Sequence, residues 1–72
     1  MKFLYDKSAD VLYAFVGDPR PGVFEESSDG IYIRLDPESG QPTGFTIINY
    51  SLQKKDGRVK NIPNFPDVQI PY

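Results

Sequence analysis

Residues 27–36 read SSDGIYIRLD and carry the clearest structural signal in the chain. Asp29-Gly30 indicates a tight turn, because these two residue types readily adopt the positive φ angles that a hairpin needs. Apolar and polar side chains then alternate along residues 31–36, which is the period of a strand with one buried face. The stretch therefore predicts a β-hairpin whose second strand turns its two isoleucines and its leucine toward a core.

The segments on both sides of this hairpin also have the composition of short strands. We predict them over residues 2–5, 11–16, 23–27 and 43–50, with turns rich in Gly, Pro, Asp and Ser between them, including a proline-containing loop over residues 17–22. Residues 23–27 are polar, which is typical of an edge strand, whereas residues 11–16 are apolar on both faces. The expected fold is mainly β, a small antiparallel meander of about five strands.

The C-terminal third of the chain has a different pattern. Ser51 is predicted to cap a single helical turn over residues 52–56, which Gly57 would end. Residues 58–72 contain three prolines and are expected to be extended. Because this tail also carries apolar residues such as Phe65 and Ile70, we expect it to dock on the body, residues 1–57, or on a partner chain.

Size and composition favour self-association. A chain of 72 residues buries only about 60% of the surface that its unfolded form exposes, so natural proteins of this size often need extra stabilisation. The chain has no cysteine for a disulfide and no histidine for an ordinary transition-metal site. We therefore expect a homodimer and no cofactor.

The charge and the apolar runs bear on class and location. A net charge of −2 argues against nucleic-acid binding, which needs a basic face. No apolar run approaches the roughly 18 residues that a membrane span requires, and the first residues do not have the pattern of a signal peptide. The expected location is the cytoplasm, without membrane attachment.

Two carboxylates, Asp6 and Asp10, flank the turn between the first two predicted strands. Aspartate often fixes a turn by accepting hydrogen bonds from nearby backbone N–H groups. The same pair, with Glu25, is the basis of an alternative hypothesis, a small metal-dependent hydrolase that binds a hard cation such as Mg²⁺. We favour the turn-fixing interpretation, because a metal site needs six or more oxygen ligands in reach.

Two candidate contact surfaces emerge from the same patterns. Glu25, Glu26 and Asp29 form an acidic stretch that could meet a basic partner protein, although charge also keeps an edge strand from aggregating. The apolar residues for which a dimer interface is predicted are Val11, Tyr13, Phe15, Phe65 and Ile70. Aromatic side chains contribute much of the burial energy at such contacts.

The order of these motifs resembles a small bacterial family, domain of unknown function 2283 (DUF2283), over residues 2–52. The residues that match the family pattern are Tyr5, Asp6, Ala9, Asp10, Leu12, Tyr13, Glu25, Gly30, Asp36 and Gly44. The resemblance implies no catalytic residue, and it suggests an antitoxin-like, partner-binding role. The chain departs from the family pattern in its proline-rich loop and in its shortened C-terminal helix.

These observations favour a non-catalytic interaction module over an enzyme. The chain has neither His nor Cys, and its glycines lie in separate turns and not in a phosphate-binding loop. The leading prediction is a protein that dimerises and possesses a surface for a second protein.

Overall fold

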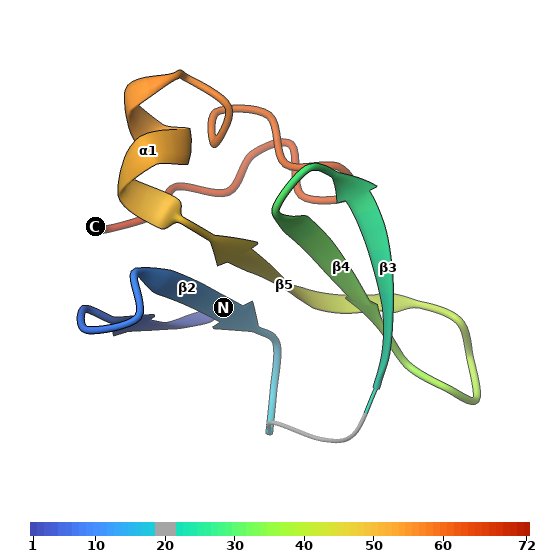
Figure 1. The fold of residues 1–72 in the computed structure, drawn as a ribbon. Coiled ribbons are helices and arrows are strands. Elements are labelled where there is room, and N and C mark those ends of the chain that lie inside the picture. The colour runs from blue at the N-terminus through green and yellow to red at the C-terminus, as the bar shows by residue number, and fades with distance from the viewer. Residues whose placement is uncertain (19–21) are drawn as a thin grey trace.

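The computed structural model describes residues 1–18 and 22–72 of the chain. The strands are β1 Lys2–Asp6, β2 Val11–Phe15, β3 Val23–Ser28, β4 Ile31–Leu35 and β5 Pro42–Ile48, and the helix is α1 Tyr50–Lys55 (Figure 1). The predicted mainly β fold is confirmed. The predicted loop over residues 17–22 lies in part outside the described residues, since these exclude 19–21. No helix in the described part of the chain has the length and hydropathy to cross a membrane.

All strand pairs are antiparallel, and the strands lie side by side in the order β1-β2-β5-β4-β3. The sheet thus combines the hairpin β1–β2 with the meander β3–β4–β5, and the two parts join where β2 pairs with β5. The composition of the strands explains this order. The polar strand β3 lies at an edge, as predicted, and the apolar strand β5 takes the central place.

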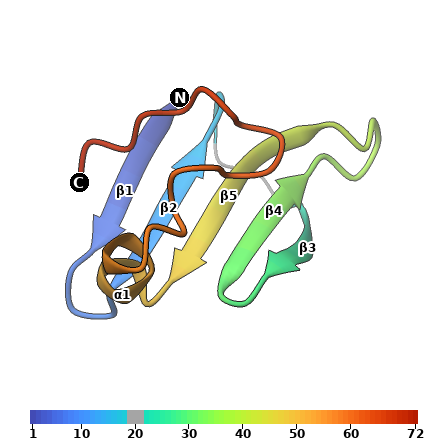
Figure 2. The same ribbon diagram turned by 90° about the horizontal axis from the view of Figure 1, so that it is seen from above.

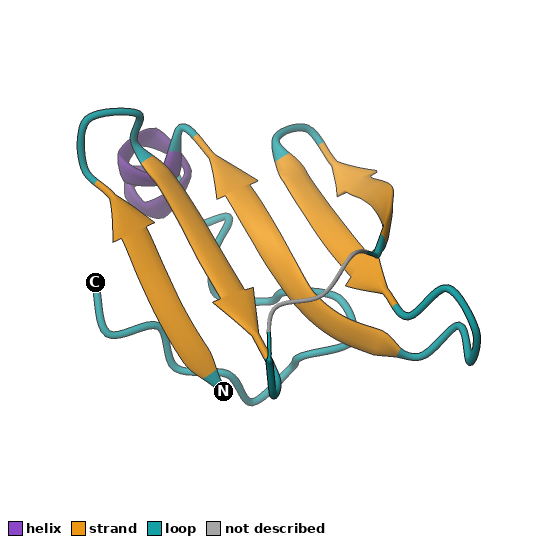
Figure 3. Cartoon of the chain, turned by 90° about the horizontal axis from the view of Figure 1, so that it is seen from below, coloured by secondary structure: helices purple, strands orange, loops and turns teal. Residues whose placement is uncertain are grey.

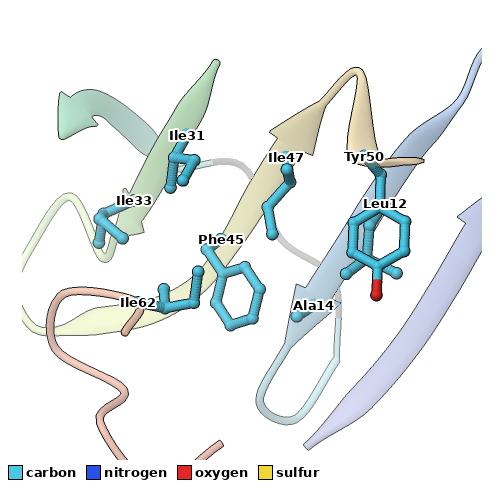
Figure 4. Close-up of a cluster of buried hydrophobic side chains, with 8 residues drawn as sticks. All are labelled: Leu12, Ala14, Ile31, Ile33, Phe45, Ile47, Tyr50 and Ile62. Atoms are coloured by element: carbon cyan, nitrogen blue, oxygen red, sulfur yellow. The ribbon is translucent and has the colours of Figure 1, made fainter. Parts of the chain in front are cut away.

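The core lies on one face of this sheet. Its buried side chains come from β2, β4, β5, the helix α1 and the tail, and Figure 4 shows them pointing into one layer. They are Leu12, Ala14, Ile31, Ile33, Phe45, Ile47, Tyr50 and Ile62. The alternation predicted for residues 31–36 is therefore confirmed at Ile31 and Ile33.

The helix and the tail together cover this face (Figure 2). Ile62 is only 1% exposed, and the Phe65 ring packs on Phe45 with centroids 5.4 Å apart. The main-chain oxygen of Tyr72 accepts hydrogen bonds from the Tyr50 hydroxyl and the Lys54 ammonium, both at 2.7 Å. Residues 58–72 thus complete the core of the same chain.

The central strand needs a glycine at one position. A Cβ atom at Gly44 would collide with the carbonyl oxygen of Ala14 on the neighbouring strand β2. Close approach of two backbones is one of the few tasks that only glycine performs in a strand. Gly44 therefore permits the β2–β5 pairing that joins the two parts of the sheet.

Replacement of Ile62 by alanine tests whether the tail belongs to the core. Deletion of a buried isoleucine side chain to alanine typically lowers the free energy of unfolding by about 2–5 kcal/mol. We expect a loss in this range in urea denaturation, whereas Leu52→Ala, at an exposed helix position, should have little effect. Equal midpoints for the wild type and the Ile62 variant would show that the tail does not contribute to stability.

Candidate functional site

Asp6 ends β1 and holds the turn that follows. Its Oδ1 atom accepts three hydrogen bonds, from the Ser8 backbone N–H at 3.1 Å, the Ser8 hydroxyl at 2.8 Å and the Ala9 backbone N–H at 3.2 Å. The Ser8 hydroxyl bond, followed by the Ala9 bond, lowers the pKa of Asp6 below its ordinary value. These contacts are the local turn geometry that aspartate forms readily.

Asp10 ends the same turn, but its carboxylate reaches the helix. Ser51 donates its hydroxyl to Oδ2 at 2.6 Å, and its backbone N–H lies 3.0 Å from Oδ1 and 3.2 Å from Oδ2. The main-chain oxygen of Asp10 accepts the Tyr50 N–H at 2.9 Å. The first N–H groups of a helix have no partner within the helix, so Asp10 caps α1 from a distant part of the chain.

The predicted N-cap role of Ser51 is wrong. The N-cap position is occupied by Asn49, whose side chain makes no capping hydrogen bond, and Ser51 lies inside the helix. The Ser51 hydroxyl is a donor to Asp10, not an acceptor for a backbone N–H. The carboxylate is favoured in this place because it is charged and because helix N-termini attract negative charge.

Tyr5 completes the group around Asp10. Its hydroxyl donates to Oδ1 of Asp10 at 2.6 Å, and its ring contacts those of Tyr50 and Tyr72, each at a centroid distance of 5.5 Å. The bond to the carboxylate raises the pKa of Tyr5, while the bonds from Ser51 and Tyr5 lower the pKa of Asp10. Asp10 therefore ties together the first hairpin, the helix and the end of the tail.

These bonds define what the carboxylates do chemically. An aspartate whose pKa lies below its ordinary value stays charged at neutral pH, which does not suit it to act as a general acid. Residues 1–18 and 22–72 contain no group of three or more His, Cys, Asp or Glu side chains that could hold a metal ion. The geometry of Asp6 and Asp10 supports a structural role.

A second candidate site lies on the sheet face opposite the helix, which Figure 3 shows from below. Residues that pair directly across antiparallel strands share a face, and the register puts Leu4 beside Tyr13 and Val11 beside Ile48. Leu4 is 60% exposed, Ile48 40% and Tyr13 38%. We call this surface the apolar patch; it consists of Leu4, Val11, Tyr13, Phe15 and Ile48.

The residues predicted for a dimer interface divide between the two faces of the sheet. Val11, Tyr13 and Phe15 belong to the apolar patch, whereas Phe65 and Ile70 pack against the core on the covered face. The structure therefore does not bring the five together on one surface. In addition, the patch contains Leu4, which is not among the five residues predicted for the interface. The alternation of side chains along residues 2–6 could have identified Leu4, because it puts Leu4 on the face opposite Phe3 and Tyr5.

On the same face, β3 and β4 present a cation beside an aromatic ring. The Arg34 guanidinium carbon lies 5.5 Å from the centroid of the Phe24 ring, a cation–π arrangement. Arg34 also pairs across the sheet with Gly44, and glycine has no side chain that could cover the Arg34 side chain. The apolar patch thus gives way to a more polar surface toward β3.

The predicted acidic surface is split as well. Glu25 pairs with Ile33 and Glu26 with Tyr32, so the two glutamates project from opposite faces of β3. Asp29 lies in the following turn, where its carbonyl oxygen accepts a hydrogen bond from Gln53 at 2.7 Å. A basic partner would meet both glutamates only along the outer edge of β3.

Fold and surface together define a class of protein. It is a small single-sheet protein, with one face packed under a helix and a tail and the other face open. The model of the family described as protein of unknown function (DUF2283) matches residues 2–51, so the chain belongs to this family and the resemblance is confirmed. No curated protein and no solved structure matches the chain. The family match includes every strand described here but ends before the tail that closes the core.

The bond between Tyr5 and Asp10 predicts a pH signature at the alkaline end. Because the folded pKa of Tyr5 is raised, its contribution to stability is complete below the ordinary tyrosine pKa and is lost as pH rises through the raised value. In Asp10→Asn, the pKa of Tyr5 should move back toward its ordinary value in an ultraviolet titration, with Tyr5→Phe used to assign the signal. In the control Asp6→Asn, the pKa of Tyr5 should stay raised.

The same bonds predict the behaviour in acid. The folded pKa of Asp10 is lowered, so its contribution is present above the ordinary aspartate pKa and is lost as pH falls through the lowered value. Urea midpoints measured from pH 6 to pH 2 should therefore fall less steeply in Asp10→Asn than in the wild type. Parallel curves for the two proteins would contradict the capping role of Asp10.

Proposed function

We propose that the chain is a small, non-catalytic interaction module that functions as a homodimer. The observation that carries the proposal is the apolar patch, since Leu4, Tyr13 and Ile48 stay exposed while the opposite face of the same sheet is packed. Exposed contiguous apolar surface on a small protein marks a place where another protein surface binds. A second copy of the chain is the simplest occupant.

The arrangement of the patch supports this proposal. Leu4, Tyr13 and Ile48 lie on neighbouring strands, β1, β2 and β5, and so form one continuous area on one side of the sheet. Lys2 and Asp6 border it on β1, with charges of opposite sign. An apolar centre with a polar border is the usual composition of a protein–protein interface.

The charged residues of β3 lie away from this area. Because β3 is the strand farthest from β1, Glu25 and Glu26 would remain accessible in a dimer formed on the β1 side. We propose this outer edge as the place where a basic protein partner binds. Opposite charge on the two partners would speed their association and fix their orientation.

Light scattering on a size-exclusion column tests the homodimer. We expect a dimer mass that falls toward the monomer mass on dilution. Tyr13→Lys, in the patch, should give monomers, whereas Phe24→Lys should remain a dimer because Phe24 lies on the same face but on β3. Circular dichroism verifies that both variants are folded. A wild-type monomer at all concentrations would contradict the proposal.

A further inference from the structure

The two edges of the sheet differ in how they are protected. On β3 every residue is exposed, two glutamates project from it, and the register shifts between Glu26 and Ser28. Charge and a bulge are the devices by which proteins keep an edge strand from pairing with another chain. The edge strand β1 also carries two charged residues, Lys2 and Asp6, but it has an unbroken register with β2, contains no proline and has an exposed leucine at its centre.

The sequence of β1 is complementary to itself when it is reversed. If KFLYD pairs antiparallel with a second KFLYD about its central residue, Lys2 lies opposite Asp6, Phe3 opposite Tyr5, and Leu4 opposite Leu4. Each of the two outer pairs joins a positive and a negative side chain. The two aromatic pairs share one face, and the leucines meet at the centre. Cross-strand pairs of these kinds stabilise antiparallel sheets.

We propose that two copies join through their β1 strands, antiparallel about a two-fold axis at Leu4, to form one continuous ten-stranded sheet. This inference rests on the proposed homodimer and specifies how its two chains meet. A two-fold axis makes every contact away from the axis occur twice, so the Lys2–Asp6 and Phe3–Tyr5 pairs each count double, whereas the leucine pair on the axis occurs once.

In this arrangement the second copy would contact residues beside β1 on both faces of the sheet. On the open face, Leu4 and the neighbouring Tyr13 of each copy would come next to the axis, so that the two apolar patches merge into one area. On the covered face, Tyr72 packs on Tyr5, and the C-terminal end of the tail runs past the outer edge of β1 (Figure 2), so the two tail ends would lie over the joined strands, beside the new aromatic pairs of Phe3 with Tyr5. Edge pairing thus covers each patch only near Leu4 and joins the remaining parts of the two patches into one open apolar area.

The charged groups are available for such pairing. The turn engages Oδ1 of Asp6, and no hydrogen bond within residues 1–18 and 22–72 engages its Oδ2. Lys2 is exposed and forms no ion pair with any carboxylate of the described residues. The joining of two edges would give both groups a partner of opposite charge.

A single cysteine at the proposed axis tests the arrangement, because the chain has no cysteine of its own. Directly opposed residues of an antiparallel pair have Cα atoms about 4.5–5.5 Å apart, within the range of a disulfide. We expect Leu4→Cys to form a disulfide-linked dimer under mild oxidation. The matched control is Glu26→Cys, which is exposed on the same face at the other edge and should remain largely unlinked.

The outcomes separate this inference from the proposed function. If light scattering shows a dimer but the Leu4 variant forms no disulfide, the copies stack face to face, since stacked sheets lie about 10 Å apart, and the edge pairing is overturned. If the wild type is a monomer, both proposals are overturned. Equal linking of the Leu4 and Glu26 variants would indicate random collision and would also overturn the edge pairing.

Reversal of one charge gives a second test. Lys2→Glu would put two like charges opposite each other at both ends of the paired strands, so we expect the dimer dissociation constant to rise roughly three- to thirtyfold. Lys7→Glu makes the same change in net charge in the adjacent turn and should leave the constant nearly unchanged. Equal effects of the two changes would show that only net charge matters, and not the pairing of Lys2 with Asp6.

Discussion

The capping of α1 by Asp10 is the interaction on which the rest of the structure depends. A helix of six residues is too short to persist by itself, because helix formation is cooperative and its first turn is costly. Asp10 supplies hydrogen-bond partners to the first N–H groups of this helix and at the same time accepts the hydroxyl of Tyr5. The helix held in this way contributes Tyr50 to the core and binds the end of the tail.

This arrangement leaves the sheet with one packed face and one open face. The helix and residues 58–72 cover the side that carries Phe45, and no second layer lies over the apolar patch in the described part of the chain (Figures 1 and 2). A chain of this size has too little sequence to cover both faces. The β1 edge, at the border of the open face, is therefore where we propose that a second copy joins the sheet.

Local patterns predicted the strands well, because alternation and turn residues act over a few positions. The hairpin at residues 27–36 and the edge position of the polar strand β3 are examples. The helix cap was not predictable in the same way, because Asp10 and Ser51 lie 41 residues apart. The strand order also depends on long-range contacts: the pairing of β2 with β5 requires the close approach at Gly44, which no local pattern reveals. The split of the predicted interface residues has the same origin, since only the docked tail shows that Phe65 belongs to the core.

A double-mutant cycle between Asp10 and Ser51 tests the central claim most directly. Free energies of unfolding are measured by urea denaturation for Asp10→Ala, Ser51→Ala and the double variant. Residues that act through one shared interaction are not additive. The capping account predicts that the double variant loses clearly less stability than the sum of the two single losses. Additive losses would show that Asp10 and Ser51 act independently and would contradict the account.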